Sequence, residues 1–464
     1  MAKDSNSNVY YCTACGYETS GYLGKCPRCG SWGTLEEKPV KTKTTSKRAG
    51  VNTGWLEESQ ASVVKLNQVK ANRSQHFSSG LSEFDRALGG GFVPGSLVLV
   101  GGEPGIGKST LLIQALANID LKDDENVLYV SGEESFEQVK ARAERLHLDT
   151  SDIILSGEVV FEDIAKIIAK LEPKLCVVDS IQTIYSAESS SSPGSVSQVR
   201  DCAAGFLRIA KALGTCIVLV GHVTKDGNVA GPRTLEHMVD TVIYFSGDQY
   251  SNLRIVRAEK NRFGATNELG IFEMTGHGLV PVDDASEALL AGSPKHVPGS
   301  AITSVIEGSR ALIIEIQALL NPTNYASPLR VTQGIDRTRV SMLMALVEKK
   351  LGLGLSNVDA FINVIGGIKA DDPATDLALI AAIVSSFNEK PLKDKLLLAG
   401  EVGLTGEVRP VSNVELRIKE ASKLNFNAMI LPGSNRKQVR KLNLDNSLEI
   451  VFVDNINEAM DIIW

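Results

Sequence analysis

The chain has 464 residues, of which 43% are hydrophobic and 22% are charged, and its formal net charge is −7. This length allows two or three domains, each with its own buried core. No run approaches the roughly 18 uninterrupted apolar residues of a membrane helix, and the polar residues 1–6 do not begin a signal peptide. We therefore expect a cytoplasmic protein with no membrane partner. The acidic charge leaves a nucleic-acid partner open, because phosphate binding needs only a local basic surface.

Four of the seven cysteines lie close together near the N-terminus. Cys12, Cys15, Cys26 and Cys29 form two C-x-x-C pairs that are separated by ten residues. Four thiolates with this spacing predict a closed tetrahedral Zn²⁺ site in a zinc-finger module over residues 9–36. We expect the module to contact DNA or protein and to take no part in catalysis. The remaining cysteines lie in apolar stretches and are expected to be small buried side chains, namely Cys176, Cys202 and Cys216.

Residues 37–72 are polar and contain few apolar side chains. The segment opens with five basic residues and no acid among them: Lys38, Lys41, Lys43, Lys47 and Arg48. We interpret it as a basic flexible linker. Two roles stay open, a plain tether and a segment that touches phosphates.

Residues 73–285 alternate short apolar runs with helix-like stretches. Five strands are predicted, over 97–100, 127–130, 175–178, 217–220 and 241–245. Four helices are predicted between them, over 110–117, 136–146, 161–171 and 197–213. Strands separated by helices of this length predict an α/β domain with a parallel sheet covered on both faces.

A phosphate-binding loop follows the first predicted strand. Residues 102–109 match G-x-x-x-x-G-K-[ST] and lead into the first helix, which is the context this motif requires. Inward-facing backbone N–H groups would hold the β-phosphate, Lys108 would reach the β- and γ-phosphates, and the Ser109 hydroxyl would bind Mg²⁺. We therefore predict ATP and Mg²⁺ as cofactors. The expected nucleotide-binding residues are Gly102, Glu103, Pro104, Gly105, Ile106, Gly107, Lys108, Ser109 and Thr110.

Polar residues end the next three predicted strands. Asp179 ends the third strand, where a carboxylate can hold the hydration shell of Mg²⁺. Glu133 and Glu134 end the second strand, and one of them, with Glu133 preferred, would polarise the attacking water. The other acid would then begin the next helix, where acids favour the dipole. His222 follows the fourth strand as a γ-phosphate sensor or as a structural histidine.

Two further segments carry a family resemblance. Residues 77–95 lead into the phosphate loop, and residues 260–264 read K-N-R-F-G. With the four-cysteine module and the C-terminal segment, they make the whole chain resemble the RadA (Sms) family of bacterial DNA repair proteins. The resemblance implies a RecA-like P-loop ATPase core. It also implies a DNA-dependent, helicase-like ATPase that forms hexameric rings and branch-migrates recombination intermediates. Its expected partners are single-stranded and branched DNA and the RecA recombinase.

The same resemblance assigns roles to residues outside the phosphate loop. Lys260 and Arg262 would act at subunit contacts, where a cation supplied in trans stabilises charge on the γ-phosphoryl group. The alternative is a surface hairpin with ordinary charges. Two loops, 186–200 and 225–233, would face the ring channel, and the candidates for DNA contact there are Lys225 and Arg233.

Residues 295–464 resemble the proteolytic domain of Lon proteases, which uses a serine–lysine dyad. Ala374 stands at the position of the nucleophile and Glu415 at that of the lysine. We therefore expect a catalytically inactive domain that packs a ring. A basic surface for DNA is suggested by four residues, which ordinary solvated charges explain equally well: Arg337, Arg339, Lys349 and Lys350.

The leading interpretation is thus a DNA-dependent ATPase of recombinational repair. A RecA-fold regulatory ATPase that acts on a protein partner is the alternative, and a Lon-like protease is disfavoured by Ala374 and Glu415. Single-stranded DNA should raise ATP turnover in the first case and leave it unchanged in the second.

Overall fold

The chain divides into two compact units, residues 1–50 and 51–464. The computed structural model describes residues 10–12, 18–19, 25, 27, 35–37, 76–222, 234–247, 252–266, 268–323, 327–442 and 448–464. In the first unit three short strands form an antiparallel sheet in the order β2-β1-β3. Their bounds are Tyr10–Cys12 for β1, Glu18–Thr19 for β2 and Leu35–Glu37 for β3.

A nine-stranded sheet dominates the first half of the second unit, in the order β12-β11-β10-β9-β4-β8-β7-β5-β6. The strands are β4 (Leu97–Gly102), β5 (Val127–Ser131), β6 (Ile153–Ser156), β7 (Leu175–Asp179), β8 (Cys216–His222), β9 (Thr241–Ser246), β10 (Leu253–Asn261), β11 (Leu269–Thr275) and β12 (Gly278–Pro281). The helices before and between them are α1 (Ser82–Ala87), α2 (Lys108–Asn118), α3 (Phe136–Arg145), α4 (Phe161–Leu171) and α5 (Val196–Leu213).

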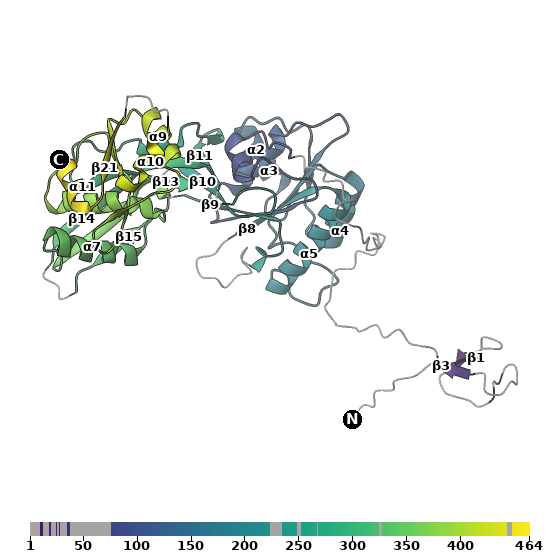
Figure 1. Cartoon of the computed structure of the whole chain (residues 1–464). Helices are drawn as coiled ribbons and strands as arrows, with labels where there is room; N and C mark the ends of the chain where they lie inside the picture. Colours follow the sequence, from purple (N-terminus) through teal and green to yellow (C-terminus); the bar gives the residue numbers. More distant parts are fainter. Residues whose placement is uncertain are drawn as a thin grey trace. The chain divides into compact units, whose positions relative to one another are not determined.

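Helices cover both faces of this sheet (Figure 1). Side chains alternate along a strand, so Val98 and Val100 face one core while Leu97 and Leu99 face the other. Apolar residues of α2 and α3 fill the first core, and those of α4 and α5 fill the second. A parallel sheet buried in this way needs strands that are apolar on both faces, as these are.

The predicted parallel sheet is confirmed, and so are its five strands and four helices. Strands β9, β4, β8, β7, β5 and β6 run parallel. The sheet also contains β6 at one edge and the antiparallel strands β10 to β12 at the other, which we did not predict. The carboxyl ends of the central strands share one edge, where Gly102 pairs with His222 and Ser131 with Asp179.

The second half of this unit contains a seven-stranded sheet in the order β15-β16-β14-β13-β17-β20-β21. Its strands are β13 (Ser300–Glu307), β14 (Arg310–Pro322), β15 (Arg330–Gln333), β16 (Val358–Val364), β17 (Leu396–Leu398), β20 (Ala428–Pro432) and β21 (Glu449–Val453). A two-stranded sheet joins β18 (Glu401–Val402) to β19 (Val408–Arg409). The helices are α6 (Ala285–Leu290), α7 (Arg337–Leu351), α8 (Asp376–Phe387), α9 (Val414–Lys423), α10 (Arg436–Val439) and α11 (Ile456–Ile462).

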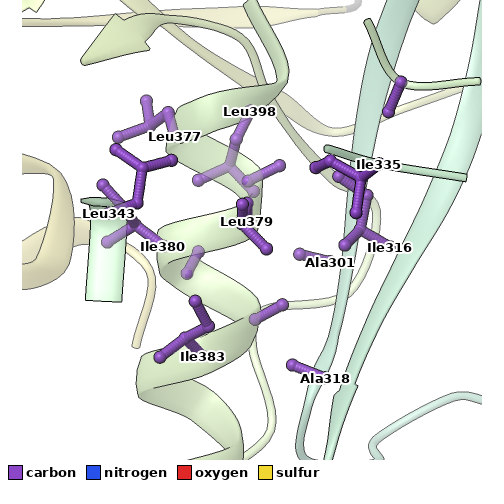
Figure 2. Packing of buried hydrophobic residues seen from close by; sticks show 14 of the residues in the cluster. Ala301, Ile316, Ala318, Ile335, Leu343, Leu377, Leu379, Ile380, Ile383 and Leu398 are labelled. Atoms are coloured by element: carbon purple, nitrogen blue, oxygen red, sulfur yellow. The ribbon is translucent and has the colours of Figure 1, made fainter. Parts of the chain in front are cut away.

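Helix α8 is buried against this sheet. Figure 2 shows Leu379 and Ile380 of α8 among the core residues of the sheet and of α7, such as Ile316 and Leu343. A helix that is apolar on all sides is stable only when it is enclosed. Helix α8 has 12 residues, which is too short to span a bilayer. Within the described part of the chain no helix is long and apolar enough to cross a membrane.

Two arginine–glutamate pairs connect the first half of this unit to the second. Arg310 at the start of β14 donates to both carboxylate oxygens of Glu83 in α1, at 3.3 and 2.9 Å. Arg257 of β10 likewise donates to both oxygens of Glu307, at 2.6 and 3.0 Å. Glu83 is almost fully buried and also accepts the Ile271 N–H at 2.9 Å.

Candidate functional site

The turn between β4 and α2 has the geometry of a phosphate-binding loop. Gly105 has φ +75° and Gly107 has φ +118°, values that favour glycine. A Cβ atom on Gly105 would meet no other atom within 4 Å, so open space lies above the loop. Helix α2 begins at Lys108 with no side-chain cap and no acid in its first turn. Its first N–H groups can therefore hold an anion, and these residues fit a triphosphate.

Lys108 is buried beneath this loop, with its side chain directed at three acceptors. Its ammonium group donates to the carbonyl oxygens of Gly102 and Glu103, both at 2.9 Å, and lies 3.1 Å from His222 Nδ1. Burial lowers the pKa of Lys108 to about 8, and the nearby carboxylates of Asp179 and Glu133 oppose that shift. The lysine is therefore charged at neutral pH but close to its titration range.

Asp179 ends β7 and is nearly buried. Its Oδ2 accepts the Tyr129 hydroxyl at 2.6 Å. Burial and the Asp179 charge raise the pKa of Tyr129 well above its usual value, so the phenol stays a donor. With one oxygen held in this way, the carboxylate has a fixed orientation and capacity left for Mg²⁺ or its waters, a ligand set that suits this ion.

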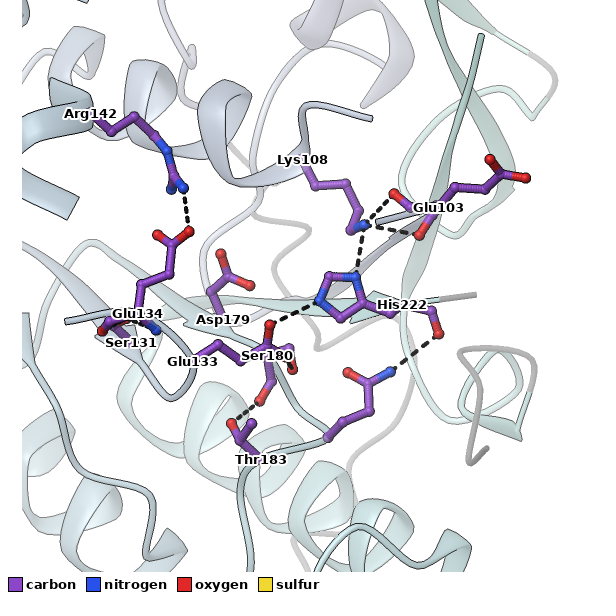
Figure 3. A network of polar contacts seen from close by, with 12 residues as sticks. Glu103, Lys108, Ser131, Glu133, Glu134, Arg142, Asp179, Ser180, Thr183 and His222 are labelled. Atoms are coloured by element: carbon purple, nitrogen blue, oxygen red, sulfur yellow. Dashed lines mark hydrogen bonds and ion pairs between the residues drawn. The ribbon is translucent and has the colours of Figure 1, made fainter. Parts of the chain in front are cut away.

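The two glutamates after β5 have different partners (Figure 3). Glu133 accepts the Ser180 hydroxyl and lies 3.3 Å from His222 Nε2, so it belongs to the Lys108 network. Glu134 forms an ion pair with Arg142 of α3. Burial of Arg142 opposes its charge, but the hydrogen bond and ion pair with Glu134 prevail and raise its pKa. Glu133 thus shares a partner, His222, with the lysine of the phosphate loop, while Glu134 is held by α3.

The K-N-R-F-G segment at the end of β10 contains two kinds of residue. Asn261 is buried and donates to Leu88 O at 2.9 Å, while its own oxygen accepts the Phe263 N–H at 3.0 Å. Lys260 and Arg262 are more exposed. Lys260 donates to Glu236 O at 2.8 Å, and Arg262 pairs with the buried Asp240 at 3.2 Å.

The structure does not bring these two cations to the phosphate loop of the same chain. Within the described residues, no hydrogen bond or ion pair joins Lys260 or Arg262 to Lys108, Asp179 or Glu133. Burial, followed by the nearby Arg262 charge, lowers the pKa of Lys260. Their position is compatible with a role toward another subunit.

The loop predicted over 186–200 differs from our expectation. Its last residues form the start of α5, which begins at Val196. The rest is held by the buried Gln198, which accepts the Ser186 N–H at 3.0 Å and donates to Ser191 O at 2.8 Å. The loop therefore ends at Ser195, which caps α5, and only the last residues of the predicted loop, which overlapped our predicted helix over 197–213, were wrong. Lys225 and Arg233 lie outside the described residues, as does the linker over 37–72 apart from Glu37.

Several residues of the site were missed from the sequence. Tyr129, Ser180 and Arg142 hold the three acids in place. Ser180 had a local signal, because it directly follows Asp179 at a strand end. Tyr129 and Arg142 had none, because they read as an ordinary strand residue and an ordinary helix residue.

The C-terminal domain has no nucleophile at the position expected for one. Ala374 is almost fully buried, and the exposed Glu415 pairs with Lys419 at 2.7 Å. Arg339, which we considered as part of a basic DNA-binding surface, instead pairs with the buried Asp376. Its ion pair accounts for Arg339 as a structural residue, while Arg337, Lys349 and Lys350 are exposed and the basic surface stays a prediction.

Most of the predicted zinc ligands lie outside the described residues. Cys15, Cys26 and Cys29 lie outside the described residues, and Cys12 is described only as part of the backbone of β1. The other three cysteines are buried and free, as expected. Burial raises the pKa of the Cys202 and Cys216 thiols to about 12, so they are unreactive at neutral pH.

The fold and the phosphate-loop geometry define a P-loop ATPase with a RecA-like core. Sequence comparison agrees, because residues 77–166 match the KaiC family of ATPases. Residues 349–464 match the Lon protease (S16) C-terminal proteolytic domain, and residues 10–37 match the rubredoxin metal binding domain.

The chain belongs to the family of the DNA repair protein RadA. It is 46% identical to DNA repair protein RadA from Bacillus subtilis over 460 residues, which is 99% of each chain. The proteins of the same name from Listeria monocytogenes and Pseudomonas aeruginosa are each 44% identical, over 99% and 98% of both chains.

Solved structures match the chain over a smaller part. The RadB recombinase has a TM-score of 0.36 and 26% identity, and covers 45% of this chain and 100% of its own. A KaiC-like protein from Pyrococcus horikoshii has a TM-score of 0.39 and 21% identity, and covers 45% of this chain and 99% of its own.

Proposed function

We propose that this chain hydrolyses ATP at the carboxyl edge of β4, β5, β7 and β8 in order to act on DNA during recombinational repair. The observation that carries the proposal is the convergence of Lys108, Asp179 and Glu133 at that edge, where His222 contacts both Lys108 and Glu133 and Asp179 pairs with Ser131 at the end of β5. Such a convergence of a phosphate-loop lysine with two carboxylates is what phosphoryl transfer to water requires.

Each residue of the site has a task in this reaction. Backbone N–H groups of residues 105–110 and the Lys108 ammonium hold the β- and γ-phosphates. The Ser109 hydroxyl and Asp179 hold Mg²⁺, which neutralises charge on the phosphates when it is bound. Glu133 accepts a hydrogen bond from the attacking water and orients it in line with the γ-phosphate.

We propose that the chain works as a hexameric, helicase-like ring. One support is the full-length similarity to proteins named DNA repair protein RadA. The other is that, among the described contacts, neither Lys260 nor Arg262 touches the phosphate site of its own chain. In the ring these residues stabilise the γ-phosphoryl charge of a neighbouring subunit. Single-stranded and branched DNA and the RecA recombinase are the proposed partners.

We also propose a division of labour along the chain. Residues 9–36 bind Zn²⁺ through Cys12, Cys15, Cys26 and Cys29, in keeping with the match to a metal binding domain. Residues 37–72 form the linker and 73–285 the motor. Residues 295–464 form a scaffold without peptidase activity, because a buried alanine and an exposed glutamate replace the dyad.

The decisive experiment measures ATP turnover of the full chain while single-stranded DNA is added. We expect turnover to rise with DNA, and we expect Lys108→Ala to abolish it with or without DNA. A Lys108→Ala protein that retains full turnover would contradict the proposed ATPase site. Turnover that is present but unchanged by DNA would instead favour the regulatory ATPase with a protein partner, and a casein digestion assay tests for peptidase activity.

A further inference from the structure

His222, the last residue of β8, uses both of its ring nitrogens within the site. Nδ1 lies 3.1 Å from Lys108 Nζ, and Nε2 lies 3.3 Å from a carboxylate oxygen of Glu133 (Figure 3). The ring therefore connects the lysine of the phosphate loop to the acid that we assign to the attacking water. Lys108 begins α2 and Glu133 follows β5, and among the described contacts His222 is the only side chain that touches both.

The protons on Lys108 determine how the ring is protonated. A charged lysine has three N–H donors and no acceptor. Its three partners are Gly102 O, Glu103 O and His222 Nδ1. Nδ1 must therefore be the acceptor, which leaves the ring proton on Nε2, where it is donated to Glu133. The hydrogen bonds run in one direction, from Lys108 through His222 to Glu133.

The number of donors on Lys108 also limits how it can bind a phosphate. All three of its donors are taken by the protein, so the lysine must release at least one acceptor before it can bind a phosphate oxygen. Two of these acceptors, the carbonyl oxygens of Gly102 and Glu103, belong to the phosphate loop itself and move with it. Among the three contacts, only the one with His222 connects Lys108 to another strand, β8.

Loss of the contact between Lys108 and His222 changes which hydrogen bond Glu133 can accept. While Lys108 donates to Nδ1, only the tautomer with a proton on Nε2 is possible. Once the lysine has left, the ring can hold its proton on either nitrogen, and the Nδ1–H tautomer cannot donate to Glu133. Glu133 would then keep the Ser180 hydroxyl as its partner and have one oxygen available for water.

We propose that His222 is a positioning residue, which joins Lys108 to Glu133 and frees Glu133 when a phosphate draws Lys108 away. This inference rests on the proposed function, because it takes Glu133 as the acid that orients water.

Two amide variants separate the two contacts of the ring. His222→Asn keeps an acceptor near the position of Nδ1 but is too short to reach Glu133. His222→Gln reaches toward Glu133 but offers no group at Nδ1. We would measure the Kd of a fluorescent ATP analogue with Mg²⁺, ATP turnover and the melting temperature of the full chain. The matched control is His237→Gln, because His237 is an exposed histidine elsewhere in the same domain.

We expect each variant to change a different quantity, Kd in one and turnover in the other. His222→Gln should bind the analogue about tenfold more tightly, because Lys108 has lost one competing partner. His222→Asn should leave Kd near the wild-type value and lower turnover about tenfold, because Glu133 is no longer positioned. His237→Gln should change neither quantity.

Nitrogen NMR of the ring adds a readout that does not depend on turnover. In the nucleotide-free protein, Nδ1 should give the shift of an unprotonated nitrogen, and Lys108→Met should remove that preference. A protonated Nδ1 in the wild type overturns the proposal, as do two amide variants that alter Kd and turnover alike. A chain whose turnover ignores DNA but whose variants split as described refutes the DNA part of the proposed function and supports this inference.

Discussion

Glu133 and Glu134 are adjacent in the chain and lie in different electrostatic surroundings. Within the described part of the chain, the partners of Glu133 are two hydrogen-bond donors, Ser180 and His222. Glu134 is held by a guanidinium group, with Arg142 partly buried beside it. An acid that orients water must keep a free lone pair near the phosphate, which the position of Glu133 provides and the ion pair of Glu134 does not.

This difference predicts opposite effects of two matched variants. Glu133→Gln should lower ATP turnover by about 10²-fold or more while the analogue still binds. Glu134→Gln should lower turnover less, but it leaves the Arg142 charge without its partner and should reduce the free energy of unfolding by about 1–3 kcal/mol. Turnover and thermal melting of both proteins check this, and a larger turnover loss in Glu134→Gln would reverse the assignment.

The lowered pKa of Lys108, about 8 in place of 10.5, predicts a pH-dependent stability. Between these two values the unfolded chain binds more protons than the folded chain, so the free energy of unfolding should rise with pH through this window. The contribution is about 3 kcal/mol when the window has been crossed.

The measurement compares denaturant unfolding of the nucleotide-free wild type with Lys108→Met from pH 7.5 to 10.5. Lys108→Met has no titrating group at this position, so the difference between the two proteins should grow in favour of the wild type as the pH rises. A constant difference over this range would mean that the lysine is not desolvated in the folded state.

At the scale of elements, the K-N-R-F-G segment is fixed to the loop that follows α1. A Cβ atom on Gly89 would lie 2.6 Å from Asn261 Nδ2 and 3.2 Å from Gly264 Cα. Asn261 and Gly264 therefore anchor the segment, and Lys260 and Arg262 are presented from that anchor.

This packing predicts that Gly89→Ala should displace the segment. The substitution adds a steric clash to the unfavourable φ of +76°, so it should reduce ATP turnover and destabilise the protein by more than 1–2 kcal/mol, roughly the cost of left-handed backbone alone. Gly214→Ala is the matched control, because Gly214 has φ +75° and nothing within 4 Å of the added Cβ. Equal turnover and melting temperature in the two variants would contradict the anchoring.

What the sequence could predict also depended on whether a feature lies within one element or between separate elements. Residues 102–109 are contiguous in the chain and lead from β4 into α2, while Asp179 ends β7 and Glu133 follows β5, so the motif and the sheet rule together predicted that these residues lie at one edge. The ring contacts of His222 and the pairing of Glu134 with α3 depend on side-chain directions across separate elements. Strands β10 to β12 were missed because antiparallel edge strands lack the helix–strand alternation that identified the others.

At the scale of the whole molecule, action in trans can be tested by mixing two inactive proteins. Lys108→Ala removes the phosphate contact, and Arg262→Ala removes the proposed cation while leaving its own phosphate loop intact. If Arg262 acts on a neighbouring subunit, mixed rings should recover turnover, because an intact loop can then meet an intact cation.

The control mixes Lys108→Ala with the double variant Lys108→Ala/Arg262→Ala, which contains no intact phosphate loop and should stay inactive. Turnover is measured after the proteins have been mixed and allowed to exchange subunits, which labelled chains can verify. Verified exchange without recovered turnover would assign Arg262 to its own subunit.

The contacts of Glu83 bear on how the protein can be divided for study. Its carboxylate is shared by α1, the backbone of β11 and Arg310 at the beginning of β14. A fragment cut after residue 294 would lack Arg310 and also Glu307, the partner of Arg257. In such a fragment Glu83 would keep the more exposed Arg86 but lose its two-pronged contact with Arg310, and Arg257 would lose the carboxylate that it pairs with. The motor domain is therefore best prepared with its C-terminal companion, even for experiments that concern nucleotide alone.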